Sequence, residues 1–381
     1  MLPAAGRFSE LGRAADAVKI LHMDLGRGWR GGQQQAFALI RGLAEAGHQV
    51  SLLARKDSPL EEKAQNARIP ALGVEPGLGA WRAAAAVRRS LQADFDLVHA
   101  HDGRSHTAAW LAGRPREVPR VVSRRVCYTL PQNLFSRLKY RLGAEQYVAV
   151  SGWVRRQLLA SGVASQKIQV IYDGVELPPE TTDALRASAR RALGVPEETF
   201  VVSCVGYLFR DKGQHRLVEA ISEIAKRRRI VLLLVGSGPL ARHLQRQVSR
   251  WGLERVVLLL GQLPDPSPVY QASDVFAFPA KNEGLGTAML VAMAHGLPVV
   301  APNLEANPEV VCDGVDGLLV ADHSPAELAR GIERLAEDAS WRAQLGKEAR
   351  RTVEARFTSA IMVRQTAALY AALVGRDRQS A

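Results

Sequence analysis

A loop of charged and glycine residues at positions 281–287 has the composition of an anion-binding turn. In it, Glu283 is followed by Gly284, Leu285, Gly286 and Thr287. The first N–H groups of a helix lack partners within that helix and attract negative charge, and a glutamate beside them can accept hydrogen bonds from hydroxyl groups. If a helix begins at Thr287, the loop suits a ligand that carries both a diphosphate and a sugar. Alternatively, Glu283 only complements the helix dipole.

A second loop, at positions 207–213, carries the cations Arg210 and Lys212. An arginine can neutralise a phosphate through two parallel N–H groups, and a lysine does so as a point charge. Each of them alone is equally well explained as a solvated loop charge. Both loops follow segments expected to be strands of one parallel sheet, and ligands bind at the carboxyl ends of such strands. We therefore expect the two loops to form one site.

Glycines also follow the first apolar segment of the chain, where Gly26, Gly28 and Gly31 fit the pattern GxGxxG and Gly32 adds another. A dinucleotide site of this kind needs an acid at the end of the next strand, but residues 53–56 read Leu-Ala-Arg-Lys. A nicotinamide site is therefore disfavoured, and a loop with glycine turns is the alternative. Residues 236–241 give a second near match, interpreted as a tight turn with Pro239 at the first helical position.

Strand-like and helix-like segments alternate around these loops, which predicts an α/β fold of parallel sheets covered by helices on both faces. The alternation breaks near residues 173–183, where Pro178 and Pro179 indicate a linker. We expect two doubly wound, Rossmann-like domains at residues 16–178 and 179–356. Residues 357–381 are expected to form a helix that packs back on the first domain. A ligand would then lie in a cleft between the two domains.

Composition narrows the class of protein. The chain has 381 residues, with 50 Lys and Arg against 38 Asp and Glu and a formal charge of +12. This surplus favours an anionic partner, namely nucleic acid, a phosphorylated substrate or an anionic membrane. Nucleic acid is the weakest of these because the basic residues lack interleaved aromatic platforms. No apolar run is long enough to span a membrane, no secretory signal is visible, and the 3 cysteines form no CxxC, so the expected location is cytoplasmic.

Much of the positive charge lies between residues 104 and 141. The basic side chains there are Arg104, Arg114, Arg116, Arg120, Arg124, Arg125, Arg137, Lys139 and Arg141, and only Glu117 opposes them. Residues 134–142 mix leucines with these cations and suit an anionic membrane surface. An ordinary helix that packs Leu134, Leu138 and Leu142 inward explains the segment equally well.

Together these motifs resemble the retaining glycosyltransferases of family 4, which have the two-domain GT-B fold. In the C-terminal half the resemblance rests on residues 283–286, 212–213, 235–239 and 273–275. In the N-terminal half it rests on residues 31–32, 46–50, 149–151 and 170–175. It implies a nucleotide-sugar co-substrate held by the C-terminal domain, an acceptor held mainly by the N-terminal domain, and transfer with retention of configuration. It also implies that no metal or separate cofactor takes part.

Carried over by residue, the resemblance makes Glu283 and Lys212 the catalytic pair, with Lys212 on the donor diphosphate and Glu283 on the transferred sugar. Arg210 joins Lys212 at the phosphates. Backbone N–H groups at positions 284–287 contact sugar and phosphate, and Gly31 and Gly32 line the donor or acceptor from the other domain. On the acceptor side, the candidates are the Arg124-Arg125 pair and His101, which follows a predicted strand and could face the cleft.

Three positions depart from the family pattern. Val291 replaces an acid that usually holds the ribose hydroxyls, and Tyr207 replaces a frequent arginine. Residues 123–126 read Ser-Arg-Arg-Val where a histidine is common, and this stretch is similar to a subgroup that acts on lipopolysaccharide or other cell-surface glycans. The sequence therefore predicts transfer to a cell-envelope glycan or glycolipid at the inner membrane face. The alternatives are a nicotinamide-dependent oxidoreductase and a weakened family member that binds glycan without turnover.

Overall fold

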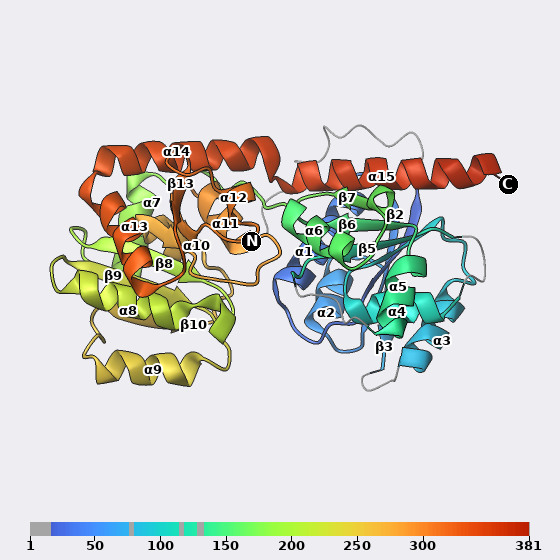
Figure 1. The fold of residues 1–381 in the computed structure, drawn as a ribbon, viewed down its shortest axis with the longest axis horizontal. Helices are drawn as coiled ribbons and strands as arrows, with labels where there is room; N and C mark the ends of the chain where they lie inside the picture. Colours follow the sequence, from blue (N-terminus) through green and yellow to red (C-terminus); the bar gives the residue numbers. More distant parts are fainter. Residues whose placement is uncertain (1–16, 76–79, 114–117, 128–132, 381) are drawn as a thin grey trace. The chain divides into compact units, whose positions relative to one another are not determined.

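The computed structural model describes residues 17–75, 80–113, 118–127 and 133–380, and the chain divides into two compact units (Figure 1). Unit 1 comprises Met1–Gly174 and Ser359–Ala381, and unit 2 comprises Val175–Thr358. The boundaries fall at residues 174 and 358, close to the linker and the helix break expected from the sequence.

Unit 1 is a seven-stranded parallel sheet in the order β3-β2-β1-β4-β5-β6-β7. Its strands are β1 (Lys19–Asp24), β2 (Gln49–Arg55), β3 (Ala71–Val74), β4 (Leu97–Ala100), β5 (Arg120–Arg124), β6 (Gln146–Ala149) and β7 (Ile168–Val170). Its helices are α1 (Gly31–Glu45), α2 (Pro59–Asn66), α3 (Ala80–Ser90), α4 (Gly103–Leu111), α5 (Leu134–Leu142), α6 (Gly152–Ala160), the short 3₁₀ helix η2 (Ser165–Lys167) and α15 (Ser359–Ser380).

Alternation along β1 assigns its side chains to the two faces of this sheet. Ile20 points to the face covered by α1 and α15, where it packs in one apolar cluster with Leu39 and Met362. Leu21 points to the opposite face and packs in a second cluster with side chains of α3 and α4. The C-terminal helix α15 is therefore part of the core of unit 1, although it follows the whole of unit 2 in sequence.

Unit 2 is a six-stranded parallel sheet in the order β10-β9-β8-β11-β12-β13. Its strands are β8 (Phe200–Val205), β9 (Ile230–Val235), β10 (Val257–Gly261), β11 (Val275–Ala277), β12 (Val299–Pro302) and β13 (Gly317–Val320). Its helices are α7 (Asp183–Ala192), η3 (Arg210–Lys212, a 3₁₀ turn), α8 (Gln214–Ala225), α9 (Ala241–Arg250), α10 (Ser267–Ala272), α11 (Thr287–Ala294), α12 (Asn307–Val310), α13 (Pro325–Glu337) and α14 (Ala339–Arg356).

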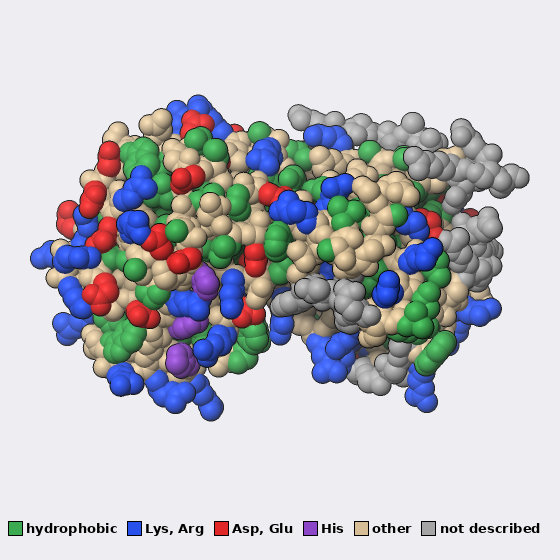
Figure 2. Space-filling view, viewed as in Figure 1, with side chains coloured by type: hydrophobic (Ala, Val, Ile, Leu, Met, Phe, Trp, Pro, Cys, Tyr) green, Lys and Arg blue, Asp and Glu red, His purple; other side chains and the backbone are tan. Residues whose placement is uncertain are grey.

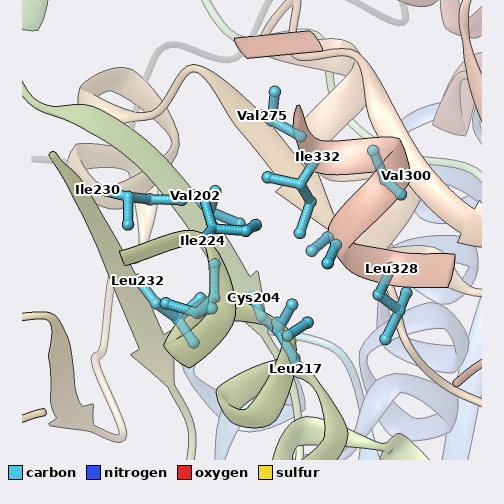
Figure 3. Close-up of a cluster of buried hydrophobic side chains, with 14 of the residues drawn as sticks. Val202, Cys204, Leu217, Ile224, Ile230, Leu232, Val275, Val300, Leu328 and Ile332 are labelled. Atoms are coloured by element: carbon cyan, nitrogen blue, oxygen red, sulfur yellow. The ribbon is translucent and has the colours of Figure 1, made fainter. Parts of the chain in front are cut away.

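The larger core of unit 2 lies between its sheet and helices α8 and α13 (Figure 3). Val202 and Cys204 of β8 meet Leu217 of α8 and Ile332 of α13 there. Val201 points to the other face and packs with side chains of α7 and α10. The expected doubly wound, Rossmann-like architecture is confirmed in both units.

Strand order identifies where each sheet can bind a ligand. In unit 1 the chain turns from β1 toward β2 on one side and reaches β4 on the other, so the order reverses between β1 and β4. In unit 2 the reversal lies between β8 and β11. The loops that leave two strands in opposite directions open a crevice at the carboxyl edge of the sheet, which is where ligands of such folds sit.

One local prediction is wrong. Helix α9 begins at Ala241 with Leu240 as its N-cap, so Pro239 precedes the helix instead of opening it. Gly236 and Gly238 have φ of 145° and 155° and lie directly against the backbone of the loop that follows β8. Any side chain at these glycines would collide with that loop. Close approach of two loops therefore shapes this turn and delays the start of the helix.

Candidate functional site

Lys212 and Glu283 form an ion pair at the carboxyl edge of the unit 2 sheet. Lys212 ends η3, in the loop that follows β8, and Glu283 lies in the loop that follows β11. Since β8 and β11 are the two strands that flank the reversal of strand order, the pair lies at the switch point of this sheet. The side chains are 32% and 16% exposed, so both groups remain accessible to a ligand.

Two glycines let these loops approach each other. Gly213 has φ of 70° and its Cα faces the carbonyl of Pro279, so a side chain there would clash with the loop after β11. Gly286 has φ of 85° and lies against the ring of Phe278 and the side chain of Met289. Both positions need glycine for its left-handed backbone and for its lack of a Cβ.

The start of α11 presents backbone N–H groups next to Glu283. The helix begins at Thr287 with Gly286 as N-cap, no side chain caps it, and its first turn holds no acid. Gly284, Leu285 and Gly286 are buried and Thr287 is half-buried. An uncapped helix start beside a lysine is suited to a phosphate.

The other positions singled out in this half lie around the pair. Arg210 is exposed on η3, two residues from Lys212. Val291 is half-buried on α11, one helical turn beyond Thr287, and its methyl groups accept no hydrogen bond. Glu305 is a carboxylate that sequence reasoning did not assign to this loop, and its Oε2 accepts a hydrogen bond from the backbone N–H of Glu283 at 2.8 Å.

The carboxyl edge of the unit 1 sheet holds a buried cluster of three histidines. Register places His22 of β1 directly opposite His99 of β4, and His101 follows β4. The ring of His22 stacks on that of His101 at 5.2 Å between centroids. His99 contacts the hydroxyl of Tyr370 from α15 through Nδ1 at 2.5 Å and that of Ser123 through Nε2 at 2.8 Å.

Hydrogen-bond chemistry assigns the tautomers of two of these rings. Arg125 lies 3.1 Å from Nδ1 of His101 and can only donate, so this nitrogen accepts. A neutral His101 then carries its proton on Nε2 and donates to Nδ1 of His22 at 3.0 Å. His22 in turn carries its proton on Nε2, which is buried and has no partner among the described residues.

Burial holds these histidines neutral. It lowers the pKa of His22 to about 3, with the charge of Arg125 as the next cause. Burial also lowers the pKa values of His99 and His101 well below the usual range, and neighbouring histidines and Arg125 add to the effect. Arg125 itself is paired with the buried carboxylate of Asp173 at 2.9 Å.

The three ring nitrogens lie within 4.8 Å of one another, a spacing that a metal ion could use. A metal-bound histidine normally donates its second N–H to an acceptor. The second nitrogen of His101 instead faces Arg125, which offers only donors. The hydrogen-bond pattern therefore fits a chain of neutral rings better than a set of metal ligands.

The carboxylates of Asp24 and Asp102 lie at the start of the glycine loop of unit 1. Asp24 accepts hydrogen bonds from the N–H of Gly26 and the side chain of Gln33. Asp102 caps α4 and also accepts the N–H of Leu25 at 2.6 Å. Burial, and then the nearby charge of Asp102, raise the pKa of Asp24. Gly31 and Gly32 open α1 beside this pair, Gly31 exposed and Gly32 half-buried.

Arg124 is directed away from the histidines. Its guanidinium donates to the hydroxyl of Tyr140 on α5 at 3.1 Å. Arg124 and Arg125 are adjacent in sequence, yet the alternation of side chains at the end of β5 sends them to different neighbours. The structure thus brings His101 and Arg125 together and separates Arg124 from them.

Helix α5 has its leucines on the outside. Leu134, Leu138 and Leu142 are 73%, 39% and 54% exposed, so the expectation that they pack inward is wrong. The helix instead buries Lys139 and Tyr140 against the unit. In Figure 2, hydrophobic side chains lie over the region of α5 with basic side chains around them. Arg114, Arg116 and Glu117 of this basic segment lie outside the described residues.

Sequence reasoning missed several polar groups of unit 1 that the fold brings together: His22, Asp24, Ser123, Asp173 and Tyr370. Asp24 ends a strand and precedes the glycine loop, so its position was a usable signal. Tyr370 offered none, because it lies 271 residues from His99 in a helix that otherwise packs apolar side chains.

Comparisons with known proteins show which family the chain belongs to. A model of glycosyl transferases group 1 matches residues 186–352, and one of glycosyltransferase family 4 matches residues 29–177. The chain is 32% identical to a D-inositol 3-phosphate glycosyltransferase of Corynebacterium aurimucosum over 68% of each sequence.

Among solved structures, HepE of Anabaena in complex with UDP-glucose is 23% identical, with a TM-score of 0.82 over 93% of this chain and 100% of that one. A glycosyltransferase of Rickettsia africae is 20% identical, with a TM-score of 0.85 over 94% and 99%. These matches do not favour the oxidoreductase alternative. The chain belongs to the family 4 and group 1 glycosyltransferases, has their GT-B type of fold, and is a glycosyltransferase.

Proposed function

We propose that the enzyme takes its sugar from a nucleotide-sugar donor held at the carboxyl edge of the unit 2 sheet. The observation that carries this proposal is the Lys212–Glu283 pair beside the uncapped start of α11, at the switch point of the sheet. A diphosphate would pair with Lys212 and the exposed Arg210 and accept hydrogen bonds from the helix N–H groups. Hydroxyls of the sugar would donate hydrogen bonds to the carboxylate of Glu283. The UDP-glucose bound to a structural neighbour is consistent with this class of donor.

The same groups account for bond cleavage. As the bond between the anomeric carbon and the phosphate oxygen breaks, its electron pair leaves with the diphosphate, and negative charge grows there. The oxygen of the acceptor hydroxyl bonds the anomeric carbon, and its proton passes to the leaving diphosphate. Lys212 and the fixed N–H dipoles of α11 face that charge and stabilise it more than the ground state. We propose transfer with retention of configuration, as family resemblance implies, which NMR of the product's anomeric proton would test.

A turnover assay with a panel of sugar nucleotides tests the donor proposal. We expect release of free nucleotide from at least one of UDP-glucose, UDP-N-acetylglucosamine or GDP-mannose. Lys212→Ala should lower kcat/KM roughly 100-fold, because one cation at a developing charge has about this effect. Lys226→Ala is the matched control, since Lys226 is an exposed lysine of the same unit, paired with Glu223 on α8. Equal rates for Lys212→Ala and wild type would refute the proposal, and donor binding without turnover would favour a weakened enzyme.

We further propose that the acceptor is phosphorylated and lipid-linked, as in a cell-envelope glycolipid, and that α5 rests on an anionic membrane. Leucines four residues apart share one helix face with Phe135, and Arg137 and Arg141 are exposed on the same helix. Exposed apolar side chains flanked by arginines suit the boundary of an anionic bilayer. No helix within the described ranges is long and apolar enough to span the membrane.

Vesicle sedimentation tests the membrane proposal. Binding to phosphatidylglycerol vesicles should exceed binding to phosphatidylcholine vesicles, and it should fall about 10-fold or more in Arg137→Ala/Arg141→Ala. Leu138→Ser should also weaken it, while Leu185→Ser should not, because Leu185 is equally exposed, at 40%, but lies in unit 2. Equal binding of the two leucine variants would contradict the assignment.

A soluble phosphorylated polyol is the second candidate acceptor. It is favoured by the name of the relative from Corynebacterium aurimucosum, a D-inositol 3-phosphate glycosyltransferase. Transfer to D-inositol 3-phosphate in free solution, at a rate that vesicles do not change, would select this candidate over a lipid-linked acceptor.

A further inference from the structure

Two residues around Glu283 have an unusual backbone conformation. Among the described residues, four non-glycine residues have positive φ, and two of these are Asn282, at 61°, and Glu305, at 56°. A residue with a side chain is unfavourable in this left-handed region and remains there only when its surroundings hold it. Glycine would adopt the same conformation without strain. The presence of a glutamate at position 305 therefore calls for a contact that only its side chain makes.

That contact is with the backbone of Glu283. Oε2 of Glu305 accepts the Glu283 N–H at 2.8 Å, across 22 residues of sequence. The loop after β11 is also tied to the loop after β8, because the N–H of Lys281 donates to the carbonyl of Asp211 at 2.9 Å. Glu305 itself follows β12. Loops from the three adjacent strands β8, β11 and β12 thus converge on the segment that carries Glu283.

The two ends of Glu283 are therefore held separately. Lys212 pairs with its carboxylate, and Glu305 fixes its peptide N–H. When Lys212 pairs with a donor diphosphate, its ion pair with the Glu283 carboxylate is weakened. The hydrogen bond that the Glu283 N–H donates to Glu305 does not involve Lys212 and remains. A hydrogen bond from a backbone N–H to a carboxylate is stronger than one between neutral groups, which suits this task.

We propose that Glu305 is a positioning residue, which sets the backbone of Glu283 so that its carboxylate meets the sugar of the donor. This inference rests on the proposed donor site. It concerns the sugar end of the donor and not the nucleotide. Loss of Glu305 should therefore impair transfer while leaving the binding of UDP, which has no sugar, largely intact.

Three variants test the inference in the full chain. Glu305→Gly keeps the backbone conformation and removes the acceptor, so we expect kcat to fall about 10-fold because Glu283 is no longer held in position against the sugar. Glu305→Gln keeps an oxygen that can accept and should stay within about three-fold of wild type. UDP affinity should change less than two-fold in both, and Tm by no more than about 2 °C. Arg68→Gly is the control for the backbone, because Arg68 also has positive φ, at 58°, but lies in unit 1.

The outcomes separate cleanly. A wild-type kcat in Glu305→Gly would overturn the inference, and so would a parallel loss of kcat, UDP binding and Tm, which would indicate a merely structural role. We expect Arg68→Gly to keep kcat within two-fold of wild type. A wild-type enzyme that neither binds UDP nor turns over any donor would instead refute the proposed donor site itself.

Discussion

The carboxyl edges of the two sheets hold ionisable groups of very different character. In unit 1 the side chains of the three histidines, Arg125 and Asp173 are buried, and the hydrogen-bond partners described for them lie within that unit. In unit 2 the lysine and glutamate are partly exposed, and glycines and helix N–H groups surround them. Substitution in the first arrangement should lower stability strongly, whereas the second arrangement is open to a ligand. The difference in burial therefore predicts a larger effect on stability from substitutions in the unit 1 cluster than from substitutions in the unit 2 pair.

The largest expected difference between the units concerns Arg125 and Lys212. Arg125→Ala leaves Asp173 buried without its partner and should lower the free energy of unfolding by about 3–5 kcal/mol. Lys212→Ala breaks a partly exposed pair and should change it by less than about 1 kcal/mol. Urea unfolding measures both. Equal losses of unfolding free energy in the two variants would contradict the contrast between the buried pair of unit 1 and the partly exposed pair of unit 2.

Acidification should lower the folding stability of unit 1 more than that of unit 2. Buried His22, His99 and His101 have pKa values below that of the unfolded chain, so the unfolded state gains protons first and stability falls below pH 6.5. Each such histidine contributes up to about 1.4 kcal/mol per pH unit in this window. Hydrogen exchange between pH 7 and pH 5 should show β4 losing protection faster than β8.

Asp24 opposes this trend, because its pKa is raised by burial and by Asp102. Its protonation stabilises the folded state as the pH falls toward the value of an unfolded aspartate. Asp24→Asn should therefore make the free energy of unfolding fall more steeply as the pH is lowered, and it should raise this free energy slightly at pH 8. A shallower acid loss in this variant would contradict the assigned direction.

Removing the hydroxyl of Tyr370 should have a smaller effect. Tyr370→Phe leaves Nδ1 of the buried His99 without its partner from α15 and should cost about 1–3 kcal/mol. A double-mutant cycle with Ser123→Ala, which removes the other partner of His99, would measure how strongly the two contacts are coupled. No change in Tyr370→Phe would mean that apolar packing alone holds α15.

The smallest effect is expected at the start of α11. Thr287→Ala replaces a half-buried side chain that does not cap the helix, so stability should change by less than about 0.5 kcal/mol. Transfer should persist within a few-fold, because the proposed contacts at this position come from the backbone. A large loss of activity with normal stability would assign a role to the hydroxyl.

The same contrast between the two units explains which features could be predicted from the sequence. The unit 2 loops carry local signals, since glycines, charges and a helix start follow one another within a few residues. The α/β alternation is local too, and it is confirmed.

The remaining features depend on contacts across the fold. Glu305 reaches Glu283 only because β12 lies next to β11, and Arg125 meets His101 because β5 lies next to β4. The outward leucines of α5 were ambiguous for a related reason. Their spacing fixes which side chains share a face, but the choice of the buried face depends on Lys139 and Tyr140 finding partners in unit 1.

The central claim is that the unit 2 edge holds the nucleotide part of the donor. Hydrogen exchange of the full chain, with and without UDP or GDP according to the sugar nucleotide that turns over, tests it most directly because it reports protection along the backbone. We predict slower exchange of amides at residues 285–288 and 210–213, and loss of this protection in Lys212→Ala but not in Lys226→Ala. Protection confined to the β1–α1 loop of unit 1, or none at residues 285–288, would contradict the claim.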